Sequence, residues 1–162
     1  GELDEQVEAA MRVAKHPDVA GFVVDAEEEF KGKTETATAL CAKLRARLGT
    51  KKLAFTSYGW IAPNRAFPYA AFDRGCGDAF LPQVYYAFGW PGDVKGSLER
   101  LDRDLAELSL HAPIWPVQSN ERAPDAARMN DFFDRTSPDA SIFYLHRDGT
   151  PQTAELSKVR FR

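Results

Sequence analysis

The chain has 162 residues, of which 44% are hydrophobic and 28% are charged, and its formal net charge is −3. A chain of this length can bury one sizeable core, so we expect a single globular domain over residues 1–162. The acidic balance, without a run of Lys or Arg, argues against nucleic acid as a partner, and no apolar stretch is long enough to span a membrane.

Hydrophobic spacing predicts helices and strands that alternate along the whole chain. Apolar residues recur every three or four positions in the predicted helices, and short apolar runs between turn residues mark the predicted strands. Helices are expected, in chain order, over 3–14, 34–48, 68–74, 98–108, 124–133 and 153–159. Strands are expected over 21–25, 53–58, 79–87, 113–118 and 141–146. No hairpin signal lies between the strands, which favours parallel strands joined by helical crossovers.

Two α/β architectures fit this alternation, a TIM-barrel type of parallel (β/α) fold and a flavodoxin-like open sheet. The number of strands favours the open sheet, because a complete barrel usually needs about 200 to 250 residues. The strand ends favour the barrel, because every strand finishes in polar or aromatic residues, and barrel strand ends converge on one mouth. We therefore expect the last five βα units of an N-terminally incomplete barrel, with the open sheet as the alternative.

Two carboxylates close the first predicted strand. Side chains alternate between the faces of a strand, so Asp25 and Glu27 are expected on one face, roughly 6.6 Å apart. Such a pair is a candidate for acid/base chemistry. The other interpretation is that acids after a strand are loop charges that face water. Glu28 and Glu29 leave a second choice open: either the catalytic assignment shifts by a residue, or these two are solvated loop charges.

Aromatic and amide side chains gather near the ends of the later strands, where they could stack on sugar rings or hydrogen-bond to them. The candidate substrate-binding residues are Tyr58, Gln83, Tyr85, Tyr86, Trp90, Trp115, Gln118 and Tyr144. No metal site and no cofactor are expected, since no His/Cys cluster and no glycine-rich phosphate loop occurs. Cys41 and Cys76 are expected to be free thiols.

These motifs resemble the glycoside hydrolase family 25 lysozymes, the muramidases common among bacterial and phage cell-wall lysins. Asp25-Ala-Glu27 after a Val-Val pair is similar to the acid pair on that family's fourth strand. The segments 55–60, 81–86 and 114–118 are similar to its later strands, on which Tyr, Trp and Gln line the sugar groove. The family's first strand usually carries a further Asp, which this sequence cannot show because the first three strands are expected to lie outside it.

The resemblance implies a hydrolase that cleaves an amino-sugar polymer such as peptidoglycan, with an extracellular, cell-wall or phage-associated location. Glu27 is expected to donate the proton, because partial burial near Tyr58 and Tyr85 raises a carboxyl pKa. Asp25, expected deeper in the barrel, stays ionised or orients the substrate's N-acetyl group. The expected partners are a polysaccharide and the remainder of the parent chain, which would supply the missing strands.

Two other functions fit the sequence. One is a non-catalytic glycan-binding or structural barrel module of a larger cell-surface or virion protein. The other is a flavodoxin-like regulatory or nucleotide-binding domain, which an open sheet with two free edges would indicate.

Overall fold

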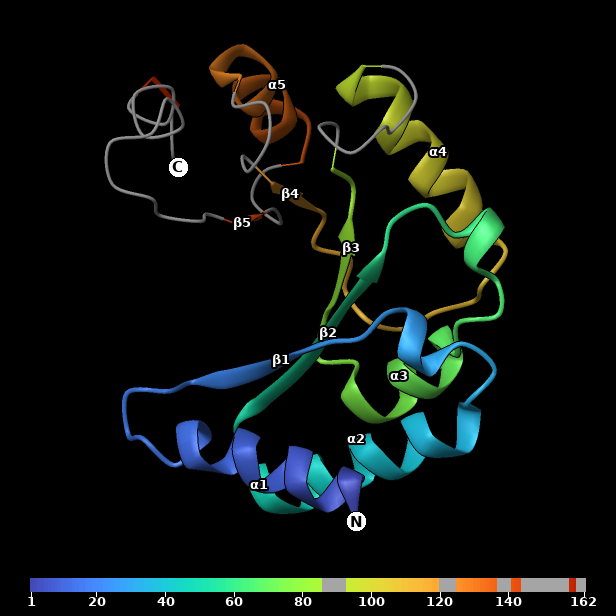
Figure 1. Ribbon diagram of the computed structural model, residues 1–162. Coiled ribbons are helices and arrows are strands. Elements are labelled where there is room, and N and C mark those ends of the chain that lie inside the picture. The colour runs from blue at the N-terminus through green and yellow to red at the C-terminus, as the bar shows by residue number, and fades with distance from the viewer. Residues whose placement is uncertain (86–92, 120–124, 137–140, 144–157, 160–162) are drawn as a thin grey trace. The chain divides into compact units, whose positions relative to one another are not determined.

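The computed structural model describes residues 1–85, 93–119, 125–136, 141–143 and 158–159. Helices alternate with the strands of a five-stranded sheet whose order is β1-β2-β3-β4-β5, and each pair with a determined register is parallel (Figure 1). The predicted α/β fold with parallel strands joined by helices is confirmed. The chain also divides into two compact units, which are described separately below.

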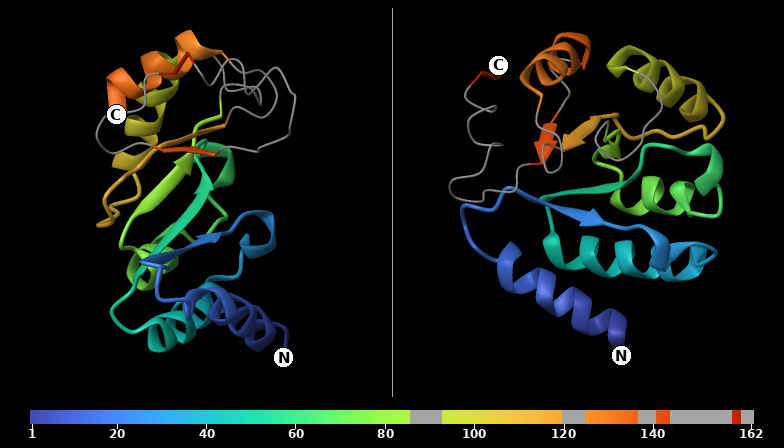
Figure 2. Two further views of the ribbon diagram at one scale, coloured as in Figure 1. Left: turned by 90° about the vertical axis from the view of Figure 1, so that its left-hand side faces the viewer. Right: turned by 45° about the horizontal axis from the view of Figure 1, so that its top comes forward.

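The first unit comprises Gly1–Ser57, Ala62–Leu81 and Leu108–Ile114. Its helices are α1 (Glu2–Ala14), α2 (Thr34–Leu48) and α3 (Tyr69–Cys76), with 3-10 helices at Glu28–Phe30 and Ala62–Asn64. Its strands are β1 (Gly21–Asp25), most of β2 (Lys52–Tyr58) and the start of β3 (Phe80–Gln83). α1 and α2 lie side by side on one face of β1 and β2 (Figure 2).

The sequence explains where these helices begin and end. α1 buries one stripe of small and apolar side chains, and it ends before His16-Pro17 as predicted. α2 begins at Thr34, with Lys33 rather than Thr34 in the capping position. It ends at Gly49, whose φ of 61° lies in the left-handed region that glycine adopts at little cost.

Aromatic rings form the core of the first unit. Phe72 on α3 lies 5.2 Å from Phe30, 5.5 Å from Phe55 and 5.1 Å from Phe67, measured between ring centroids. Phe55 on β2 stacks in turn on Phe80 of β3 at 4.5 Å. Phe55 and Phe80 therefore point toward the helices, and their neighbours in sequence point to the other face of the sheet.

A disulfide joins α2 to α3, so the prediction of two free thiols is wrong. Cys41 and Cys76 are both fully buried, and their Cα atoms lie 5.4 Å apart. Sequence spacing could not reveal the pair, because the two cysteines are 35 positions apart and the chain between them includes all of β2. The two helices pack so closely here that a Cβ on Gly75 would lie 2.5 Å from the Cβ of Cys41.

The second unit comprises Tyr58–Ile61, Pro82–Glu107 and Trp115–Arg162. Its elements are the end of β3, α4 (Val94–Ala106), β4 (Val117–Ser119), α5 (Ala126–Thr136) and β5 (Ser141–Phe143). The carboxylate of Asp93 caps α4 by accepting from the N–H of Gly96 at 2.7 Å. Asp125 caps the start of α5, since its Oδ1 accepts from the N–H groups of Ala127 and Arg128.

The strands of the second unit are shorter than predicted within the described residues. β3 ends at Gln83, so the predicted strand over 79–87 is too long. The predicted strand over 113–118 is reduced to an isolated bridge at Ile114 and the short β4. Pro113 and Pro116 explain this break, because proline has no N–H to donate to a neighbouring strand. The predicted helix over 153–159 lies almost wholly outside the described residues.

Candidate acidic site

The candidate acids lie at the carboxyl end of β1, in the first unit. Asp25 is the final residue of the strand and lies opposite Thr56 of β2. The next residue, Ala26, still donates its N–H to the carbonyl of Thr56 at 3.1 Å. Glu27 lies beyond the strand and precedes a 3-10 helix, with φ −137° and ψ −122°. The spacing expected for two residues of one strand therefore does not apply to this pair, because Glu27 lies outside the strand.

Exposure alternates through this segment even after the strand has ended. Val24 and Ala26 are buried, Asp25 is exposed and Glu27 is half-buried. The alternation supports the expectation that the two acidic side chains point away from the buried side. Their depths are the reverse of those predicted, because Asp25 and not Glu27 is the more exposed of the two.

The two additional acids, Glu28 and Glu29, each make a hydrogen bond to a residue close to them in the sequence. The Lys31 ammonium donates to Glu28 Oε2 at 2.6 Å, and the Glu28 side chain is exposed. Glu29 Oε1 accepts from the backbone N–H of Glu27 at 3.0 Å. Of the two choices that the sequence left open, these contacts favour loop charges, and the Glu29 contact also fixes the backbone at Glu27.

A pocket of about 510 Å³ adjoins the acids within the first unit. Its wall is mainly apolar and is formed by α1, β1 and α2, with Ala10, Val24 and Leu44 among the lining residues. Asp25 and Glu29 are the acidic members of the wall. An apolar pocket with a few carboxylates is able to bind a mixed polar and apolar surface.

The two predicted amide residues of the second unit have different surroundings. Gln83 ends β3 and is half-buried, and its carbonyl accepts from the N–H of Gly59 at 3.2 Å. Gln118 is only 1% exposed, and its Nε2 donates to the carbonyl of Val84. The residue opposite Gln83 on β4 is Val117, so Gln83 and Gln118 point to opposite faces of the sheet. Both residues were predicted to line one groove.

The predicted aromatic residues of the second unit differ in exposure. Tyr58 ends β2, Tyr85 follows β3 by two residues, and both are half-buried. Trp115 is 42% exposed. Trp60 is 36% exposed, and the Arg100 guanidinium lies 4.4 Å from the centroid of its ring. Three predicted residues lie outside the described part of the chain: Tyr86, Trp90 and Tyr144.

Sequence reasoning missed two buried polar groups of the first unit. Asp73 on α3 accepts from the backbone N–H groups of His111 and Ala112 at 2.8 to 3.1 Å, and its Oδ2 lies 3.1 Å from His111 Nδ1. The apolar helix pattern around Asp73 gave no sign of this role. Ser57, near the end of β2, has a buried hydroxyl without a hydrogen-bond partner within the described structure.

Among the residues that the structure describes, no cluster of His, Cys, Asp and Glu could hold a metal ion. Within the same residues, no helix is long and apolar enough to cross a membrane. Comparisons with protein-family models, with curated proteins and with solved structures found no match to this chain. Its function is therefore argued from its own residues.

Proposed function

We propose that this chain is part of a TIM-barrel-type glycoside hydrolase that cleaves an amino-sugar polymer such as peptidoglycan. The observation that carries the proposal is the pair of carboxylates, Asp25 and Glu27, at the carboxyl end of a parallel strand that is followed by a helix. Active sites of α/β proteins with parallel strands are formed at this end of the strands.

The chemistry needs one carboxyl group that protonates the leaving oxygen and a second group that stabilises the positive charge at the sugar carbon. Glu27 is assigned the first role, because it is the more buried acid and burial disfavours the charged form of a carboxyl group. The exposed Asp25 is assigned the second role, either directly or by orienting an N-acetyl group of the substrate.

Exposed aromatic rings of the second unit support a carbohydrate substrate. Trp115 is 42% exposed, and Arg100 adds hydrogen-bond donors above the ring of Trp60. Sugar rings combine apolar C–H faces with hydroxyl edges, so they suit an aromatic ring with a polar neighbour. Substrate contacts are assigned to these residues and to the half-buried Tyr58 and Tyr85.

The same rings favour a second candidate function, a glycan-binding module without turnover. Stacking on Trp60 and Trp115 requires neither Asp25 nor Glu27. A binding module would retain its affinity for peptidoglycan when both carboxylates are neutralised, whereas a hydrolase would lose turnover.

The test compares Glu27→Gln with the matched variant Glu28→Gln, which removes a neighbouring carboxylate that pairs with Lys31. Release of reducing sugars from purified peptidoglycan and cosedimentation with it are measured for each protein. We expect Glu27→Gln to lower release by about 100-fold or more while binding is kept, and Glu28→Gln to behave as wild type.

Four other outcomes contradict the hydrolase. Equal loss of release in both variants, or full release by Glu27→Gln, would remove Glu27 from the mechanism. Binding by the wild type without any release would favour the module. The absence of both binding and release would reject both functions.

A further inference from the structure

Arg100 and Trp60 form a cation–π pair at the surface of the second unit. Arg100 lies on α4, and Trp60 follows the carboxyl end of β2 by two residues. The guanidinium carbon of Arg100 lies 4.4 Å from the centroid of the Trp60 ring, inside the roughly 6 Å range of a cation–π contact. Arg100 is half-buried, whereas Trp60 stays 36% exposed although the guanidinium lies over its ring. Solvent therefore reaches both members of the pair.

The hydrogen-bond donors of Arg100 are not used by the part of the chain that the structure describes. Its guanidinium makes no hydrogen bond and no ion pair with any described residue, not even with Asp104, four positions further along α4. A guanidinium carries five N–H donors, and its attraction to an aromatic ring consumes none of them. The contact with Trp60 therefore positions the charge of Arg100 and leaves its donors open to a ligand.

A carboxylate is the group that suits these donors. The planar guanidinium fork matches the two oxygens of a carboxylate, so the two groups form paired, charge-assisted hydrogen bonds. Because Arg100 already lies over Trp60, less side-chain freedom is lost when a ligand binds than for an arginine that extends into solvent. Half-burial also reduces the screening of its charge by water and salt.

The adjoining indole favours a carboxylate that is carried on a sugar ring. The C–H faces of a sugar pack against aromatic rings, and the exposed part of Trp60 lies next to the guanidinium. A sugar with a carboxylate on its ring can contact the indole and reach Arg100 at the same time. A neutral sugar of the same size would make only the first contact.

We propose that Arg100, held over Trp60, binds a carboxylate group of the glycan, so that the protein prefers an acidic sugar to a neutral one. This inference rests on the proposed function, which supplies a glycan as the ligand. Arg100 is in this view a specificity-determining residue that takes no part in bond cleavage.

The test measures binding of three oligosaccharides of equal length to the whole chain by isothermal titration calorimetry. The first alternates N-acetylglucosamine with glucuronic acid, the second is its methyl ester, in which the carboxylate charge is removed, and the third contains N-acetylglucosamine alone. We expect the acidic oligosaccharide to bind about tenfold more tightly than either neutral one, the usual effect of a hydrogen-bonded charge.

Three variants assign this preference to Arg100. Arg100→Gln should reduce the ratio of the two dissociation constants, acid against ester, to about one and leave the affinity for the neutral oligosaccharides unchanged. Arg100→Lys keeps the charge without the fork and should retain part of the preference. Arg103→Gln removes the same charge from an exposed position of α4 and should bind as wild type does. Circular dichroism checks that each variant is folded.

Several results would overturn the proposal. They are equal affinity of the wild type for acid and ester, failure of the acidic oligosaccharide to bind, an unchanged ratio in Arg100→Gln, and an equal loss in Arg103→Gln. The hydrolase proposal is judged separately, by the release of reducing sugars. Release without a preference for the acid would reject only the role of Arg100, and a preference without release would reject only the hydrolase.

Discussion

Arg45 on α2 binds Asp78 in the turn before β3, with 2.9 Å between Nη1 and Oδ2. The same Oδ2 accepts from the backbone N–H of Leu53 at 2.7 Å. One carboxylate therefore holds the helix, the start of β2 and the entry to β3 together. The pKa of Asp78 is lowered: burial alone raises it, but the hydrogen bonds from Arg45 and Leu53 and the nearby positive charges outweigh that effect.

This contact predicts a pH-dependent stability. A carboxyl group with a lowered pKa in the folded state stabilises the fold above its unfolded pKa of about 3.9, and that contribution is lost as the pH falls through the folded pKa. Asp78→Asn should cost about 1 kcal/mol of the free energy of unfolding at pH 7, and the difference from wild type should shrink below about pH 4. Urea unfolding at several pH values measures this. Asp102→Asn, at an exposed position of α4, is the control and should show neither effect.

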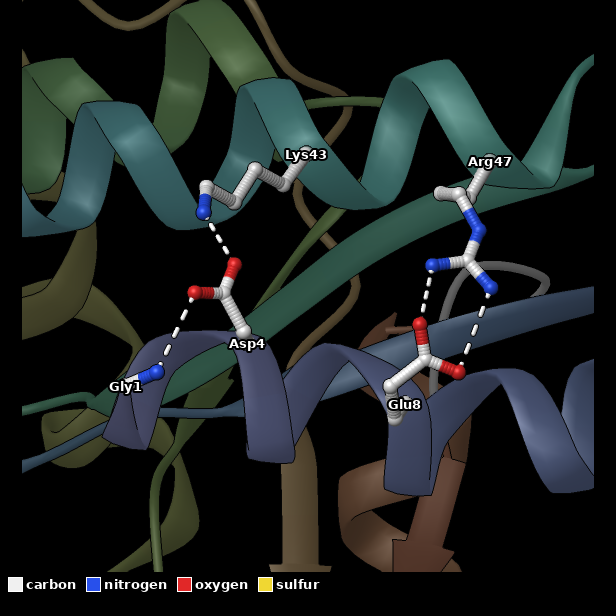
Figure 3. A network of polar contacts seen from close by, with 5 residues as sticks. All are labelled: Gly1, Asp4, Glu8, Lys43 and Arg47. Carbon is white, nitrogen blue, oxygen red and sulfur yellow. Dashed lines mark hydrogen bonds and ion pairs between the residues drawn. The ribbon is translucent and has the colours of Figure 1, made fainter.

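The ion pairs between α1 and α2 should contribute much less. Asp4 pairs with Lys43 and Glu8 pairs with Arg47 on the protein surface (Figure 3). The Arg47 hydrogen bond lowers the pKa of Glu8, but both partners are exposed, so water and salt screen the pair. We expect Glu8→Gln to change the melting temperature less than Asp78→Asn does, and the change to vanish in high salt. A larger, salt-independent effect would contradict this.

The disulfide should be a major source of stability. It closes a loop of 35 residues, for which the chain-entropy model predicts about 4 kcal/mol of stabilisation. Replacing Cys41 and Cys76 together by Ala should lower the free energy of unfolding by about 3 to 4 kcal/mol. Thiol titration of the folded wild type should detect no free cysteine. A titre of two thiols with an unchanged midpoint of unfolding would contradict the bond.

The aromatic core predicts a second large effect. Phe72 contacts three other phenylalanine rings and is fully buried. Phe72→Ala should therefore cost about 3 to 5 kcal/mol, through lost burial and a residual cavity. The control is Ala70→Ser, at an exposed position two residues before Phe72 on the same helix, which should leave the stability nearly unchanged. Chemical unfolding of both variants gives the comparison.

Local patterns in the sequence predicted the order of the helices and strands. The features that the sequence did not predict depend on contacts between residues far apart in the chain. The helical stripe before His16-Pro17 and the apolar run that ends at Asp25 are read from neighbouring residues, and both predictions are confirmed. The Cys41–Cys76 bond and the carboxylate of Asp73 depend on partners more than 30 positions away, and no local pattern reports them.

In the candidate site too, some features follow from local sequence patterns and others depend on the surrounding structure. The alternation of exposure around Asp25 follows from the strand period, whereas the depth of Glu27 depends on where the strand ends. Val117, and not Gln118, lies opposite Gln83, so the two amide side chains are on opposite faces of the sheet, and Gln118 is buried.

Asp73 also decides how this protein can be divided. Its carboxylate ties His111 and Ala112 to α3 across 38 and 39 positions of sequence, so the segment Leu108–Ile114 belongs to the first unit although α4 precedes it. A gene fragment that stops after β3 would leave a buried negative charge without its donors and the end of the sheet uncovered. Dissection into separately expressed halves should therefore give insoluble product.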